Sequence, residues 1–115
     1  RFGDRSHLYI SGTASIGKDG SVLHPGDVRK QTERTIENVT ALLATEGASF
    51  DDLAYLFVYV RDFHDYEAVR EILAPRIAGN LPILFLHAAV CRPAWLVEME
   101  GVATIPGASS FPPFV

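Results

Sequence analysis

The segment that most constrains the fold is Leu53–Val60, which reads Leu-Ala-Tyr-Leu-Phe-Val-Tyr-Val and carries no charge, glycine or proline. β-Branched and aromatic residues favour strands, and an apolar run without polar alternation is typical of a strand buried on both faces. We therefore expect a central strand here. A sheet built around it needs a cover on each side.

A long helix is expected to supply part of one cover. It opens at Pro25-Gly26-Asp27, where the side chain of Asp27 can cap the first free amides, and Gly47 follows its end. Its apolar positions recur at helical spacing. They are Val28, Thr32, Ile36, Val39 and Leu43, with Leu42 widening the stripe.

A second helix is expected after the central strand, capped by Asp65 and interrupted or ended by Pro75. Its buried face would consist of Val69, Ile72, Leu73 and Ile77. The remaining strands are predicted at His7–Gly12, Ser21–Leu23, Pro82–Val90 and Trp95–Thr104, the first two joined in a hairpin by Lys18-Asp19-Gly20. The order predicts an α+β fold, with two helices packed on one face of a mixed β-sheet.

Length and composition limit the classes of function that are possible. A chain of 115 residues is one domain, which we expect over residues 1–105, with a surface arm at 106–115. The start, Arg1-Phe2-Gly3-Asp4, favours a fragment of a longer chain. A net charge of −4 without a basic stripe argues against nucleic acid as a partner, and no segment is a membrane span. We expect a cytoplasmic protein without a cofactor.

Few residues could bind metal or form disulfides. The single cysteine, Cys91, excludes an internal disulfide framework and a multi-cysteine zinc site. The histidines at positions 7, 24, 64 and 87 lack metal-ligand spacing, so no metal site is expected. Within the apolar run 83–90, His87 is interpreted as a core histidine.

The last strand alternates between two faces. Trp95, Val97, Met99 and Gly101 share one face, and Leu96, Glu98, Glu100 and Val102 share the other. If the first face meets the helices, the second meets either water or another copy of the sheet. The apolar residues on both faces of Leu53–Val60 favour another copy, so we expect a homo-oligomer or a pseudo-oligomer with a missing domain.

Glu98 is the main candidate for chemistry, because a carboxylate between valine and methionine in a strand is unusual. A partly buried glutamate with a raised pKa would be a general acid or base, whereas an exposed one would simply pair with an arginine. Cys91 is by default a buried structural thiol. Arg61, Arg70 and Arg92 could each hold a substrate carboxylate or be surface charges.

Several segments resemble the RidA/YjgF family. They are Leu8–Ala14, Gln31–Val39, Gly47–Leu53, Val58–Asp62 and Leu96–Gly101, in the order and at the spacing of that family. The resemblance implies a chorismate-mutase-like α+β subunit. It also implies a homotrimer with sites in the clefts between subunits.

The resemblance implies two possible enzymatic activities, and the first is deamination. Deaminases of the family convert enamines and imines to 2-oxo acids with an arginine that binds the substrate carboxylate and a glutamate that positions water. Glu98 matches the glutamate, but the arginine position falls on Ile83. A non-catalytic RidA-like binding module is a further alternative, in which Glu98 is only a carboxylate on the sheet.

The segments Cys91–Glu100 and His24–Asp27 resemble the C-terminal RidA-like domain of chorismatases, which remove pyruvate from chorismate. This resemblance implies that Glu98 protonates the enolpyruvyl methylene and that water attacks the resulting oxocarbenium carbon. A cysteine at position 91 implies the subtype that releases 3-hydroxybenzoate rather than a dihydroxycyclohexadiene carboxylate. Arg70 is the local candidate for binding a substrate carboxylate, with further cations expected from the missing N-terminal part.

Overall fold

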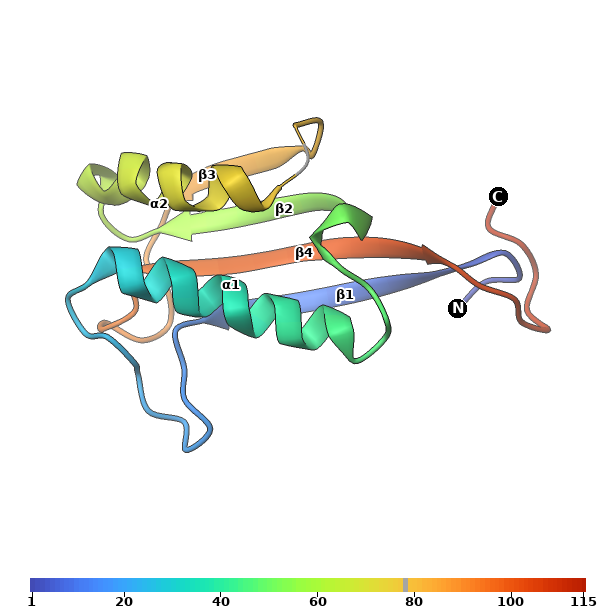
Figure 1. The fold of residues 1–115 in the computed structure, drawn as a ribbon, viewed down its shortest axis with the longest axis horizontal. Coiled ribbons are helices and arrows are strands. Elements are labelled where there is room, and N and C mark those ends of the chain that lie inside the picture. The colour runs from blue at the N-terminus through green and yellow to red at the C-terminus, as the bar shows by residue number, and fades with distance from the viewer. Residues whose placement is uncertain (78) are drawn as a thin grey trace.

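The structure is a computed structural model that describes residues 1–77 and 79–115. Its elements are β1 (Arg5–Ala14), α1 (Val28–Ala44), β2 (Leu53–Val60), α2 (Tyr66–Leu73), β3 (Ile83–His87) and β4 (Val97–Pro106). The strands form one sheet in the order β1-β4-β2-β3. β4 is antiparallel to β1 and β2, whereas β2 and β3 are parallel. Both helices lie along the same face of this sheet (Figure 1), which confirms the predicted α+β architecture.

Asp27 caps α1 and Gly47 follows its end, as the sequence predicts, but the buried stripe of the helix is shifted. Asp27 accepts a hydrogen bond from the amide of Lys30 at 3.0 Å, and Gly47 has a φ of 71° in the left-handed region that favours glycine. The expectation for Leu42 is wrong, because its side chain is 48% exposed at the flank of the helix. Gln31 and Thr35 are buried in its place.

The second helix has part of the predicted apolar face and a different cap, since Ile72 is only half-buried and Ile77 lies beyond the helix. Val69 and Leu73 are buried, and a 3₁₀ turn over Ala74–Arg76, which contains Pro75, follows the helix. Asp65 makes no side-chain capping bond, because another 3₁₀ turn precedes the helix. Asp62 caps that turn instead and accepts from the amide of His64 at 3.0 Å.

The predicted hairpin is reduced to a tight turn. The turn is closed by a single β-bridge between Ile16 and Val22, and Ser21–Leu23 is not a strand. The amide of Gly20 donates to the carbonyl of Gly17, so pairing has room for only one bridge. Within the described residues the sheet therefore has four strands, one fewer than predicted.

The strand predicted at Leu53–Val60 is found with the same bounds, between β4 and β3. The last strand runs through Pro106, which lies opposite Arg5 at the end of the ladder. The residues after it return to the N-terminus, where the amide of Gly3 donates to the carbonyl of Pro112 at 2.8 Å. The two chain ends consequently lie near each other in Figure 1.

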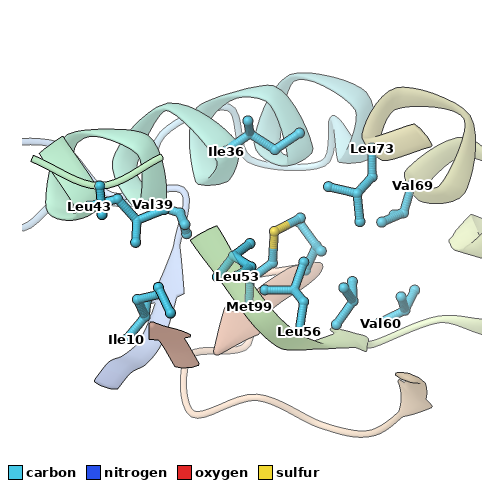
Figure 2. Packing of buried hydrophobic residues seen from close by; sticks show 14 residues of the cluster. Ile10, Ile36, Val39, Leu43, Leu53, Leu56, Val60, Val69, Leu73 and Met99 are labelled. Carbon is cyan, nitrogen blue, oxygen red and sulfur yellow. The ribbon is translucent and has the colours of Figure 1, made fainter. Parts of the chain in front are cut away.

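The hydrophobic core fills the space between the helices and one face of the sheet. Figure 2 shows Ile36 and Val39 of α1 pointing toward Leu53 and Met99. Val39, Leu56 and Met99 are each 0% exposed. This packing fixes which residues of β2 and β4 face the helices, and therefore which residues face away from them.

Candidate functional site

The face of the sheet away from the helices, which we call the open face, carries both apolar and acidic side chains. Its register pairs Glu98 with Tyr59 and Glu100 with Phe57 across β4 and β2. Tyr9 of β1 and Leu84 of β3 are 79% and 51% exposed at its two sides. Among the described residues, both helices lie on the opposite face of the sheet and no helix covers this one. The predicted alternation along β4 is therefore confirmed.

A β-bulge places the carboxylate of Glu98 against a glycine. Ile10 lies opposite Gly101, but Thr13 lies opposite Met99, so β1 carries an extra residue in between. A Cβ added to Gly12 in this bulge would collide with Oε1 of Glu98. The carboxylate of Glu98 can lie in this position beside the backbone of β1 only because residue 12 has no side chain.

Burial and charge distinguish Glu98 from its neighbour on the same face. Oε2 of Glu98 is buried and has no hydrogen-bond partner among the described residues. Burial raises the pKa of Glu98, and the charge of Glu100 raises it further. No ion pair of the described residues involves Glu98, which disfavours the interpretation as an arginine-paired surface charge.

Glu100, in contrast, has a partner. The hydroxyl of Tyr59 donates to Oε1 of Glu100 at 2.6 Å, and this hydrogen bond is the main reason why the pKa of Tyr59 is raised. The two carboxylates therefore differ although they lie two residues apart on one strand. Glu98 is suited to hold a proton, and Glu100 is suited to accept a hydrogen bond.

Cys91 lies in the connection between β3 and β4, which crosses the end of β2. Its side chain is exposed, so the default interpretation as a buried structural thiol is wrong. Glu98 is the second residue of β4, so both residues lie at the same end of the sheet. The thiol and the carboxylate have no direct contact among the described hydrogen bonds.

Arg70 does not meet Glu98 within one chain. It lies on α2, in the layer that covers the opposite face of the sheet, and its guanidinium donates to Glu67 at 2.9 Å. Arg92 lies over the ring of Trp95 at 4.7 Å and donates to the carbonyl of Gly20. Arg61 donates to three main-chain carbonyls of the Cys91 connection.

The remaining candidates do not gather into a site. His87 is exposed rather than a core residue, because its side chain lies at the outer strand of the sheet with the ring centroid 6.4 Å from that of Phe63. Over residues 1–77 and 79–115, no three His, Cys, Asp or Glu side chains come together as a metal site would require. No helix in the same part of the chain has the length and apolarity to cross a membrane.

Two residues of the site escaped the sequence analysis. Gly12 supports Glu98 only because β1 bulges, and a register shift depends on the partner strand. Gln31 is 0% exposed on α1 and binds the backbone at Ala94 and Leu96. Gln31 lies three residues after Val28, on the buried stripe of the helix, and this spacing could have indicated that it is buried.

The chain matches a family model and several solved structures. The family described as Endoribonuclease L-PSP matches residues 3–105. A chorismatase crystal structure is 31% identical with a TM-score of 0.77, and the match covers 84% of this chain but 32% of the chorismatase chain. The chain thus spans about a third of the length of that enzyme.

Two further structures show the fold alone, because their identities are low. RidA from an Antarctic Psychrobacter bacterium is 22% identical with a TM-score of 0.77, covering 86% of this chain and 80% of its own. A member of the conserved Rid protein family from Yersinia pestis is 24% identical with a TM-score of 0.78, again covering 86% and 80%.

Proposed function

Because the chain belongs to the Endoribonuclease L-PSP family, also called RidA/YjgF, we propose that it is the RidA-like domain of a chorismatase-type hydrolase. The similarity to the chorismatase chain at 31% identity supports this choice within the family. The substrate would be chorismate, a small carboxylate, and the products pyruvate and a ring carboxylate.

The observation that carries the proposal is the carboxyl of Glu98, whose Oε2 is buried without a partner on the open face. Protonating a carbon atom requires a carboxylic acid that still holds its proton near neutral pH. Burial raises the pKa of Glu98, which is the direction that this task demands. Glu100 is less suited, since the hydroxyl of Tyr59 donates to its carboxylate.

The reaction then proceeds at the two carbons of the enol-ether double bond. Glu98 gives its proton to the enolpyruvyl methylene, and the positive charge develops on the carbon that bears the ether oxygen. Water adds to that carbon and returns a proton to the Glu98 carboxylate. The hemiketal that forms passes its hydroxyl proton to the ring oxygen as the bond to that oxygen breaks, which releases pyruvate. The ring product is a dihydroxycyclohexadiene carboxylate, and loss of one water from it gives 3-hydroxybenzoate.

Cys91 and Arg70 take the substrate-binding roles in this proposal. Cys91 would form part of the pocket wall at the Glu98 end of the sheet and would favour the 3-hydroxybenzoate product. Arg70 could reach a substrate carboxylate only from a neighbouring subunit or domain, since it lies behind the sheet. We propose that a homotrimeric or pseudo-trimeric packing, with a missing N-terminal domain, covers the open face and brings such residues together.

Imine deamination is the alternative, and the structure offers it no cation at the expected place. Ile83 packs partly against the hydrophobic core. Its neighbour Leu84 is exposed on the open face and is also uncharged. A substrate carboxylate would therefore lack the bidentate arginine contact on which that chemistry depends.

The test is pyruvate release from chorismate by the protein in its full natural length. Glu98→Gln is expected to lower kcat at least ~100-fold, the order of magnitude of general acid catalysis. Glu100→Gln is the matched control on the same strand and face, and its kcat should stay within about tenfold of wild type. Full activity in Glu98→Gln would refute the catalytic role.

If the wild type releases no pyruvate, the chorismatase proposal fails. Turnover of 2-aminoacrylate-type imines would then support the deaminase alternative. Absence of both activities would favour a binding module.

A further inference from the structure

The Cys91 loop, which we define as residues 88–96, joins the end of β3 to the start of β4. It crosses the end of β2, because β2 lies between those two strands in the sheet. The amide of Ala88 donates to Val60, and the amide of Arg61 donates to Leu96. The loop thus begins at the last residue of β2 and ends at the residue that follows this strand.

Arg61 fastens the middle of this loop with its side chain. Nε donates to the carbonyl of Trp95 at 2.8 Å, and Nη2 donates to the carbonyls of Val90 at 2.7 Å and Arg92 at 2.9 Å. A guanidinium is a rigid fork, so three such bonds fix both the distance and the orientation of the loop. Cys91 lies between two of these three anchor points.

Gln31 holds the same loop from the helix side. Its Nε2 donates to the carbonyl of Ala94 at 2.9 Å, and its Oε1 accepts from the amide of Leu96 at 2.9 Å. The indole of Trp95 adds a bond to the carbonyl of Ser15 at 3.1 Å. Side chains from α1, from the end of β2 and from the loop itself therefore converge on one short segment.

The guanidinium of Arg61 thus binds main-chain carbonyls of the loop, and the nearest of them in the sequence, that of Trp95, lies three residues before Glu98. Connections between strands are ordinarily the mobile parts of a fold, and a loop of this kind needs no arginine merely to turn. We propose that Arg61 is a positioning residue, which holds the Cys91 loop as a fixed wall of the Glu98 site. The inference rests on the proposed function of that site.

The experiment compares Arg61→Met, Arg61→Lys and Arg29→Met with wild type. Arg61→Met keeps the aliphatic stem and removes the donors, whereas Arg61→Lys keeps a charge that can replace part of the bonds. Arg29→Met is the control, because Arg29 loses only an exposed ion pair with Glu71 on the helix layer. Circular dichroism and thermal unfolding establish that each variant is folded at the assay temperature.

The first measurement is the alkylation rate of Cys91 by iodoacetamide, followed by mass spectrometry together with hydrogen exchange of the same peptide. Loss of charge-assisted hydrogen bonds should change this rate roughly tenfold in Arg61→Met and less in Arg61→Lys. Arg29→Met should stay within about twofold of wild type. If Arg61→Met does not fold, Arg61→Lys carries the comparison. Rates equal to the control would overturn the proposal.

The second measurement is turnover of chorismate. We expect kcat/KM to fall roughly tenfold in Arg61→Met, with a changed ratio of 3-hydroxybenzoate to dihydroxycyclohexadiene carboxylate. Arg61→Lys should recover part of both. A loosened loop with unchanged kinetics and product ratio would show a purely structural role and overturn the positioning role.

The two proposals fail in different ways. A wild type that releases no pyruvate removes the chorismatase function and the positioning role with it. The fastening of the loop by Arg61 is still decided by alkylation and hydrogen exchange.

Discussion

The two faces of the sheet are built from the same strands and have different tasks. On the face toward the helices, Leu56, Val58 and Met99 are each 0% exposed. On the open face, their neighbours Tyr55 and Glu98 remain partly accessible, and Tyr55 is 38% exposed. Folding of one chain accounts for the first set of residues but not for the second.

The open face has the features of a surface that binds another molecule. An exposed apolar face with an unpartnered carboxyl is costly for a chain that acts alone, since both features favour contact with something else. In our proposal the covered face determines stability, and the open face serves assembly and chemistry. Substitutions on the two faces should therefore have separable effects.

The largest effect is expected on the covered face. Met99→Ala removes a fully buried side chain and should lower the free energy of unfolding by about 3 kcal/mol. Urea denaturation followed by circular dichroism measures this change. A loss below about 1 kcal/mol would mean that the site collapses around the smaller side chain and that the core is not packed as described.

A smaller loss in the free energy of unfolding is expected at Gln31, a buried polar residue of α1 in the helix layer. Gln31→Leu keeps the approximate volume but leaves the amide of Leu96 without its partner, at a cost of about 2 kcal/mol. Thr40→Val is the control, because its exposed hydroxyl bonds only within α1 and its loss should cost less than about 0.5 kcal/mol. Equal stabilities for the two variants would contradict the role of Gln31.

On the open face, the expected effect is on assembly rather than on folding. Leu84→Asp places a charge on a side chain that is 51% exposed in the single chain. We expect its dissociation constant for self-association to rise at least ~10-fold, a change of about 1.4 kcal/mol, with an unchanged circular dichroism spectrum. Sedimentation equilibrium measures this constant, and an unchanged mass distribution would contradict the proposed packing over the open face.

The smallest effect concerns Glu98 and pH. Its folded pKa is raised above the unfolded value, so between the two values the folded state binds more protons and stability falls as pH rises. Glu98→Gln removes this loss and should be more stable than wild type at pH 7.5, with the advantage gone at pH 4. Urea midpoints at both pH values provide the test, and an advantage that is the same at both would exclude the linkage.

The sequence predicts the covered face better than the site. Leu53–Val60, the cap at Asp27 and the alternation around Met99 are all local patterns, and local patterns suffice when one face meets a core. The strand at Ser21–Leu23 fails because a tight turn leaves room for one bridge. Residues that act through another part of the chain, such as Gly12 beneath Glu98, depend on a register that one strand does not encode.

The Cys91 loop illustrates the same limit. Arg61 reads as a possible substrate anchor in the sequence, since nothing near it predicts that three carbonyls will converge on its guanidinium. The exposure of Cys91 depends on the conformation of that loop, so the sequence does not indicate it either. Only the packed structure shows that these residues and Glu98 share one end of the sheet.

The proposed chemistry of the open face requires a proton on Glu98. Titration of its side-chain carboxyl by ¹³C NMR, with Glu98→Gln to assign the resonance, measures that proton in the folded protein. We predict a midpoint above 4.5, the ordinary glutamate value, because burial disfavours the charged form. A midpoint at or below 4.5 would mean that Glu98 is ionised like a surface carboxylate, and it would contradict its role as the acid of the open face.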